Sequence, residues 1–326
     1  MDPVTPLLRK FSFVRALERK VQRLERRVAE LGQSEGRLES EIRRLQSEAA
    51  AWTRFCPHGH FYSPLPSGAD IAAGLARPAE GPPFAGIDLN LDGQLSLLGE
   101  IAESYSAMPF PDEPTAGWRF FLNNPSYGPY DASVLFGVVR HLAPGRVVEV
   151  GCGYSSAAFL DMNEHVLGGR LAITFIDPDL SQLRRLVSPQ EAARLSLLEV
   201  PVQQAPIAPF SELQANDILF VDTSHVSKFG SDVNHLFFKV LPELRPGVWV
   251  HLHDVTWDLE YPRDWLVEGR AWNELYMLRA FLMYNRSFRV MFSSALMFEQ
   301  HKAFVRERMP RCAGGGGGQI WLRREG

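Results

Sequence analysis

The chain has 326 residues and a mass of 36.7 kDa, enough for one catalytic domain with accessory segments. Hydrophobic residues make up 45% and charged residues 22%, an ordinary globular composition that supports a buried core. The formal net charge of -4 argues against a nucleic-acid-binding protein, because affinity for phosphates requires concentrated positive charge. No signal peptide or membrane-spanning run is visible, and three scattered cysteines suit a reducing compartment. We therefore expect a cytoplasmic protein that binds neither nucleic acid nor membranes.

Residues 1–52 differ from the rest of the chain and are expected to form a coiled-coil helix. Apolar residues recur there with alternating steps of three and four, and they are Val14, Leu17, Val21, Leu24, Val28, Leu31, Leu38, Ile42, Leu45, Ala49 and Trp52. This spacing gives a narrow apolar seam that suits a partner helix. β-branched residues at the a positions and leucine at the d positions favour a parallel two-stranded coil, so we expect a homodimer. The alternative is a solitary helix packed on its own domain.

Residues 53–130 are rich in proline, glycine and aromatic residues, and are expected to form an arm or lid with one helix from about Asp92 to Tyr105. From 131 to 326 the pattern is regular, with a helix to about His141 and then β-branched runs alternating with helices. The expected strands are Arg146–Val150, Leu171–Ile176, Leu195–Val200, Asp217–Val221, Val248–Leu252, Phe288–Phe292 and Gln319–Arg323. This pattern predicts an α/β fold, a Rossmann-like, seven-stranded and mainly parallel sheet with helices on both faces. The glycine run 314–318 is expected to be a flexible connection.

The loop after the first expected strand carries the first candidate binding residues. It reads Glu149-Val150-Gly151-Cys152-Gly153-Tyr154-Ser155-Ser156. Two glycines one residue apart allow a tight turn and a close approach of the backbone to a ligand. The third glycine of the dinucleotide-binding fingerprint is absent, and Glu149 would repel a pyrophosphate but suit an ammonium group. The loop therefore favours a cationic ligand over a dinucleotide.

Acidic residues and histidines follow three further strands. Asp177 ends the second strand, where a carboxylate can accept both hydroxyls of a ribose. Asp222 and His225 follow the fourth strand, and His253 and Asp254 follow the fifth. Ligands of open parallel sheets lie beyond the carboxyl ends of the strands, and the fourth and fifth strands are expected to be neighbours, so the last four residues should converge on one pocket. Helix capping and buried structural histidines are the alternatives for each residue taken singly.

These motifs resemble those of the class I S-adenosylmethionine-dependent methyltransferases, and most closely a bacterial branch of small-molecule and sugar O-methyltransferases with D-x-S-H and H-D motifs. The resemblance covers residues 131–326 and rests on the glycine loop, Asp177, Asp222–His225 and His253-Asp254 in the same order and spacing. Further segments that look alike are 60–66, 124–131, 224–234 and 266–274.

The resemblance implies an enzyme that uses S-adenosylmethionine as its methyl donor. The residues that it assigns to the cofactor are Glu149, Gly151, Gly153, Tyr154, Asp177, Gln203 and Asp222. Gln203 would flank the adenine, and Glu149 would hold the methionine part. Related metal-dependent enzymes hold a divalent cation at the ends of the fourth and fifth strands, where this chain offers Asp222, His253 and Asp254. Magnesium prefers oxygen ligands, so magnesium, manganese and the absence of a metal all stay open.

Methyl transfer to a hydroxyl also requires a base. The catalytic candidates are His225, His253 and Asp254, since histidine titrates near pH ~6.5, and His225 is preferred because its loop would face the methyl group. The resemblance implies that the acceptor is a hydroxyl of a saccharide or a small natural product, with an amine or a carboxylate left open. Aromatic residues expected near the cleft suit sugars and planar rings alike, and they are Tyr127, Tyr130, Trp257, Tyr261, Trp265 and Trp272. The alternatives are a nicotinamide-dependent oxidoreductase and a non-catalytic coiled-coil scaffold with a degenerate methyltransferase domain.

Overall fold

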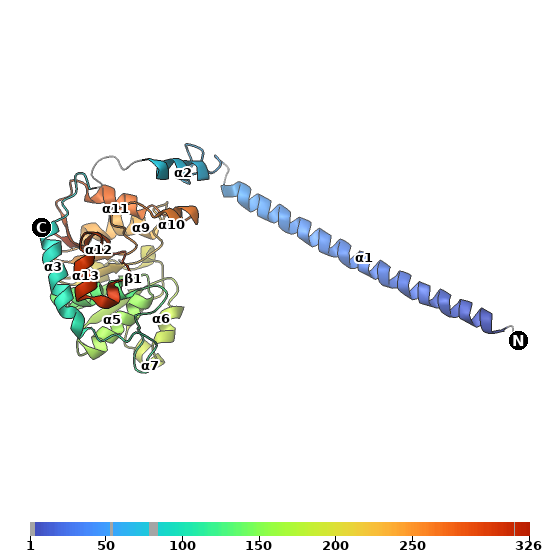
Figure 1. Cartoon of the computed structure of the whole chain (residues 1–326), viewed down its shortest axis with the longest axis horizontal. Coiled ribbons are helices and arrows are strands. Elements are labelled where there is room, and N and C mark those ends of the chain that lie inside the picture. The colour runs from blue at the N-terminus through green and yellow to red at the C-terminus, as the bar shows by residue number, and fades with distance from the viewer. Residues whose placement is uncertain (1–3, 53–54, 78–83, 316) are drawn as a thin grey trace. The chain divides into compact units, whose positions relative to one another are not determined.

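The computed structural model describes residues 4–52, 55–77, 84–315 and 317–326, and within the first helix it describes the side chains of residues 17 and 19–48. The chain divides after Ala76 into two compact units (Figure 1). Among the described residues, no helix is both long enough and apolar enough to cross a membrane. Each unit is described separately below.

The first unit is built on one long helix. Helix α1 runs from Val4 to Trp52 without interruption, and a short helix α2 covers Gly68–Ala76. The side chains of the seam are between 47% and 68% exposed at Leu17, Val21, Leu24, Val28, Leu31, Leu38, Ile42 and Leu45. The long N-terminal helix is thus confirmed, with an apolar stripe open to solvent. The side chains of Val14, Ala49 and Trp52 lie outside the described residues, and pairing of the helix in a coiled coil stays a prediction.

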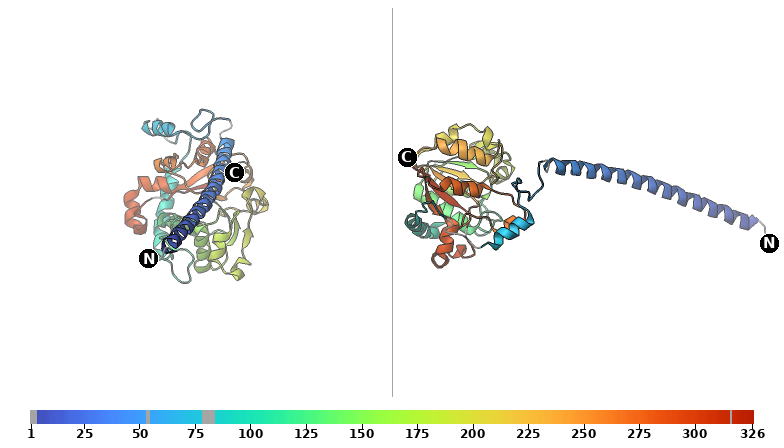
Figure 2. Two further views of the ribbon diagram at one scale, coloured as in Figure 1. Left: turned by 90° about the vertical axis from the view of Figure 1, so that its right-hand side faces the viewer. Right: turned by 90° about the horizontal axis from the view of Figure 1, so that it is seen from above.

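A seven-stranded sheet forms the centre of the second unit (Figure 2). Its strands are β1 Arg146–Val150, β2 Ala172–Ile176, β3 Ser196–Leu198, β4 Ile218–Val221, β5 Trp249–Leu252, β6 Phe288–Ser293 and β7 Ile320–Arg324. The strand order is β3-β2-β1-β4-β5-β7-β6. The first five strands pair in parallel, whereas β7 lies antiparallel between β5 and β6. The predicted mainly parallel sheet is therefore confirmed.

Helices cover both faces of the sheet, as predicted. The longer ones are α3 Leu91–Ser104, α4 Pro129–Leu142, α5 Tyr154–His165, α11 Glu274–Leu282, α12 Ser294–Gln300 and α13 Lys302–Arg308. The shorter ones are α6 Ser181–Leu186, α7 Pro189–Ala192, α8 Ala208–Ser211, α9 Asp232–His235, which continues as a π-helical turn over Leu236–Val240, and α10 Arg263–Val267. Two hydrophobic clusters result, one between the sheet and α3, α4, α5 and α12, the other between the sheet, the π-helical turn and α11.

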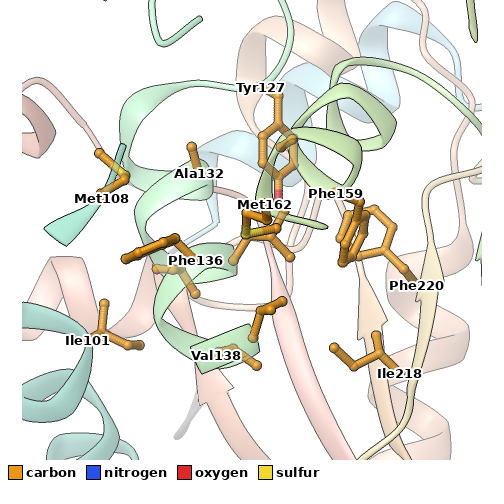
Figure 3. Packing of buried hydrophobic residues seen from close by; sticks show 14 of the residues in the cluster. Ile101, Met108, Tyr127, Ala132, Phe136, Val138, Phe159, Met162, Ile218 and Phe220 are labelled. Carbon is orange, nitrogen blue, oxygen red and sulfur yellow. The ribbon is translucent and has the colours of Figure 1, made fainter. Parts of the chain in front are cut away.

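The first cluster joins the segment before α4 to the sheet (Figure 3). Phe159 of α5 meets Phe220 of β4 edge to face with ring centroids 5.3 Å apart. Tyr127 and Phe136 are buried in the same cluster. Tyr127 therefore belongs to the core rather than to an open aromatic surface.

Asp161 of α5 anchors part of the predicted arm to this core. Its side chain is fully buried and accepts the backbone N–H groups of Arg119 and Phe120, each at 2.8 Å. The Arg119 guanidinium adds a bond of 2.8 Å to the same carboxylate. Residues 119–120 are thus held by one carboxylate that satisfies three donors.

Replacing Asp161 with alanine should lower the free energy of unfolding by about 3 kcal/mol or more, because two backbone N–H groups and part of a guanidinium lose their acceptor. Glu164→Ala is the matched control, since Glu164 also bonds Arg119 but is exposed. The control should lose less than about 1 kcal/mol. Denaturant unfolding followed by circular dichroism measures both, and equal losses would contradict the role given to Asp161.

Candidate functional site

The loops after β1 and β4 lie in direct contact, and Gly151 makes this approach possible. Gly151 has a φ of +86°, and a Cβ at this position would overlap the carbonyl oxygen of Asp222. The N–H of Asp222 donates to Val150 O at 2.9 Å, and the N–H of Cys152 donates to Asp177 Oδ2 at 2.8 Å. The ends of β1, β2 and β4 are therefore fixed against one another through the glycine loop.

A cleft of about 440 Å³ opens at this edge of the sheet, within the size range of small-molecule sites. Four predicted cofactor residues line it, and they are Gly151, Asp177, Gln203 and Asp222. Gln203 is held in place by a bond of 2.8 Å from its Nε2 to the carbonyl oxygen of Gly230. The structure thus brings residues from the ends of four strands to one cavity.

The other three predicted cofactor residues lie outside the wall of this cleft. Glu149 is fully buried beneath the loop and accepts a hydrogen bond of 2.6 Å from Ser155 Oγ. Gly153 caps the first turn of α5. Tyr154 lines a neighbouring hollow with Arg185, among other residues.

The carboxyl group of Glu149 is chemically unusual. Burial raises the pKa of Glu149 to about 8. Its second oxygen, Oε2, has no hydrogen-bond partner within the described part of the chain. A buried carboxyl with one free oxygen beside the loop can receive a hydrogen-bond donor or a cation, as the sequence predicts for this residue.

Three carboxylates surround the imidazole of His225. Its Nε2 lies 3.4 Å from Asp222 Oδ1 and 3.2 Å from Asp254 Oδ2, and its Nδ1 lies 2.8 Å from Glu274 Oε2. Ligand atoms of Asp222, His225 and Asp254 all fall within 4.8 Å of one another, close enough to share a metal ion. His225 and Asp254 both have positive φ angles, +57° and +55°, a strained backbone that is typical of functional sites.

The carboxylates decide the charge of His225. Burial by itself would lower the pKa of the imidazole, but hydrogen bonds and charge from Asp222 and Glu274 outweigh burial and raise the pKa to about 10. At neutral pH the imidazole of the free protein is therefore positively charged, with a proton on each ring nitrogen. It can act as a base only when this stabilisation is reduced.

His253 lies beside this group but is not part of it. Its ring centroid is 5.3 Å from that of Tyr127 and 5.5 Å from that of His251. Its Nδ1 is buried and has no partner among residues 84–315 and 317–326. Burial acts to lower the pKa of His253, but the charges of Asp222, Asp131 and Asp254 together outweigh burial and raise the pKa. The set of close metal-ligating groups thus contains His225, where the sequence indicated His253.

The serine of the D-x-S-H motif has a structural task. Ser224 Oγ donates to Asp232 Oδ1 at 2.6 Å, and the N–H of Ser224 donates to Asp232 Oδ2 at 2.9 Å. These bonds fix the loop to the first turn of α9. Asp222 and His225 are left to face the cleft and the neighbouring carboxylates.

The glycine run before β7 packs against Asp131 and against the loop after β5. A Cβ on Gly317 would overlap the carboxylate of Asp131, and the carbonyl oxygen of Gly318 accepts the N–H of Val255 at 2.7 Å. The prediction of a flexible connection is wrong for these two positions, because close packing, not freedom of movement, requires glycine there. Gln319 Nε2 also donates to Asp131 Oδ1 at 2.9 Å.

Two residues of this site were missed from the sequence. Glu274 starts α11 and Asp131 lies in the first turn of α4, and both are buried carboxylates beside the predicted histidines. Both fall in segments that carry the family resemblance. No local pattern marks them, because their partners are distant in the sequence.

Comparison with known proteins agrees with this geometry. A family model described as a methyltransferase domain matches residues 148–255. An uncharacterized protein of Archaeoglobus fulgidus is 31% identical over 168 residues, which cover 50% of this chain and 75% of that protein.

Three solved structures that match this chain share little sequence with it. A putative O-methyltransferase from Klebsiella pneumoniae has 15% identity and a TM-score of 0.37, over 78% of this chain and 94% of its own. The CmcI-N160 apo-structure has 17% identity and a TM-score of 0.39, and the match covers 80% of this chain and 96% of that structure. The SAH-bound methyltransferase PaMTH1 of Podospora anserina has 15% identity and a TM-score of 0.36, and the match covers 71% of this chain and 88% of that structure.

The methyltransferase model spans the chain from within β1 to just beyond β5, the part that forms the cleft. The sheet is seven-stranded and mainly parallel, as the resemblance implies, and acidic and glycine-containing loops follow its strands. The chain belongs to the class I S-adenosylmethionine-dependent methyltransferases.

Proposed function

We propose that the protein transfers the methyl group of S-adenosylmethionine to a hydroxyl of a saccharide or a small natural product. The contact between Asp222 and His225 supports this proposal most strongly. Asp222 lines the cleft, whereas His225 and Asp254 line a small adjoining cavity of about 10 Å³. A donor bound in the cleft would therefore lie next to groups that handle a proton. Alignment of donor and acceptor supplies most of the rate enhancement in such a transfer.

In this proposal the cleft residues hold the cofactor by complementary chemistry. Asp177 accepts the ribose hydroxyls, and Gln203 lies against the adenine. The backbone at Gly151 allows close approach of the methionine part, and the carboxylate of Asp222 favours a cationic donor. Glu149 beneath the loop offers its free oxygen, Oε2, to a donor group of the methionine part. Asp177 is well placed, because the N–H groups of Cys152 and Asp179 already orient its two oxygens.

Asp177→Asn should weaken binding of S-adenosylhomocysteine by about tenfold or more, because hydrogen bonds to a charged group contribute about 1.5–3 kcal/mol each. Asp179→Asn is the matched control, since Asp179 is exposed and does not line the cleft. Isothermal titration calorimetry measures both affinities. An unchanged affinity for Asp177→Asn would remove Asp177 from the cofactor site.

The residues around His225 fit a divalent cation. Three carboxylates face one imidazole, so the group keeps an excess of negative charge even when the imidazole is protonated. Asp222 and Asp254 supply carboxylate oxygens, which suit magnesium and manganese alike. A bound cation would lower the pKa of a hydroxyl acceptor. We assign Asp222 and Asp254 to the cation and His225 to the proton of the acceptor.

The cation and the base depend on each other in this proposal. In the free protein His225 stays protonated because its carboxylate neighbours stabilise the positive charge. A cation near Asp222 and Asp254 would repel the imidazolium and lower the pKa of His225. The imidazole would then be free to accept the proton of the acceptor hydroxyl.

NMR titration of ¹⁵N-histidine-labelled protein checks this coupling. In the presence of a chelator His225 should lose its proton only as the pH rises towards about 10, since the folded state raises its pKa above the ordinary value. Saturating magnesium should move the midpoint to lower pH. His141, which is partly exposed and distant from the three carboxylates, serves as the internal control. A midpoint that does not respond to the cation would contradict the coupling.

Aromatic side chains support the choice of acceptor. The Trp272 ring lies 4.4 Å from the His225 ring, and the Arg270 guanidinium lies over Trp265 at 4.8 Å and over Trp272 at 5.0 Å. Aromatic faces pack well against sugar rings and planar rings. A screen of hydroxylated acceptors with and without chelator, analysed by product mass, identifies the acceptor and tests the metal requirement together.

The exposed seam of α1 supports a homodimer. Its apolar side chains follow the heptad spacing of a coiled coil and lie open to solvent.

Free thiols at the three cysteines agree with action in the cytoplasm.

Deletion of residues 1–52 should convert the dimer to a monomer, because the deletion removes the complete seam. Light scattering coupled to gel filtration measures the mass of both proteins. S-adenosylhomocysteine binding is the control for folding of the remaining chain. A truncated protein that stays dimeric would show that α1 serves another purpose.

A further inference from the structure

The carboxylate of Glu274 reaches the far side of the His225 ring. Glu274 is the first residue of α11, and its side chain is buried with 6% exposure. Its Oε2 lies 2.8 Å from His225 Nδ1, although the two residues are 49 positions apart. This is the shortest of the three contacts between the imidazole and a carboxylate, which are 2.8, 3.2 and 3.4 Å.

The start of α11 also holds the backbone of His225. The N–H groups of Asn273 and Glu274 donate to the carbonyl oxygen of His225 at 3.0 and 3.1 Å. Asn273 Oδ1 accepts the N–H of Ser227 on the same loop at 2.5 Å. These bonds stabilise His225 at its positive φ, a conformation that costs free energy without such support.

A tryptophan side chain also packs against the His225 ring. Trp272 lies against the imidazole with ring centroids 4.4 Å apart. With Nδ1 occupied by Glu274 and this face covered, Nε2 is directed at the gap between Asp222 and Asp254. A carboxylate that accepts one ring N–H of a histidine sets its tautomer and its orientation.

We propose that Glu274 is a positioning residue that fixes the orientation of His225 and, once the ring has given up one proton, its tautomer, so that Nε2 faces the reaction site. The inference rests on the proposed function of Asp222, His225 and Asp254. Glu274 acts through His225 and does not itself contact the cofactor cleft.

Three variants of the full chain separate positioning from a purely structural role. Glu274→Ala removes the acceptor, and Glu274→Gln keeps an acceptor oxygen but not its charge. Glu268→Gln is the matched control, because Glu268 lies six residues earlier, is exposed and pairs with Arg270. NMR of ¹⁵N-histidine-labelled protein at one fixed pH reports the Nδ1 proton of His225, assigned with His225→Gln. Titrations with manganese and with S-adenosylhomocysteine are run on each protein.

The proteins should differ in the NMR signal of the His225 Nδ1 proton. The slowly exchanging Nδ1 proton of His225 should be present in the unaltered chain and in Glu268→Gln, shifted in Glu274→Gln and lost in Glu274→Ala. Manganese should still bind both Glu274 variants, because Glu274 contacts His225 and neither of the residues assigned to the cation, Asp222 and Asp254. S-adenosylhomocysteine affinity should stay within about twofold, because the cofactor cleft does not include Glu274.

Two results would overturn the proposal. An unchanged His225 signal in Glu274→Ala would show that the carboxylate does not orient the ring. An equal loss of manganese and S-adenosylhomocysteine affinity would assign Glu274 a structural role. If the unaltered chain binds no manganese, the metal part of the proposed function fails, and the NMR comparison still decides the role of Glu274.

Discussion

The crowding of three carboxylates around one imidazole is the constraint on which this site depends. Bringing Asp222, Asp254 and Glu274 together costs free energy, because like charges repel and part of their hydration is lost. A protonated His225 offsets part of that cost. The cluster therefore depends on a rigid framework that holds its members at fixed distances.

That framework is the edge where the parallel strands end. β4 and β5 are neighbours in register, so the residues that follow them are adjacent. The remaining support comes from segments distant in the sequence, namely the first turn of α11 and the glycines before β7. The strained backbone at His225 and Asp254 shows how tightly these segments define the site.

Much of this arrangement could be predicted from the sequence, for an identifiable reason. Strand boundaries fell within two residues of the observed ones, because short β-branched runs between helices leave few other choices. Asp177, Asp222, His225 and Asp254 could be found because ligand residues gather at strand ends. The match to a methyltransferase domain also counts against the nicotinamide-dependent oxidoreductase.

The rest depended on tertiary contacts that no local pattern records. Glu274 reads as an ordinary residue at the start of a helix, and only the fold shows that it reaches His225. Gly317 reads as part of a flexible run, and only the proximity of Asp131 shows why a side chain does not fit. The choice between His225 and His253 in the metal-ligating group depended on side-chain direction, which a strand and its loop do not determine.

The position of β7 has a consequence for how the sheet is assembled. This strand fills the place between β5 and β6, yet it follows both of them in the sequence, at Ile320–Arg324. The pairing of β5 is therefore complete only when β7 has been inserted beside it. Until then β5 presents an unpaired edge that could bind other extended chains.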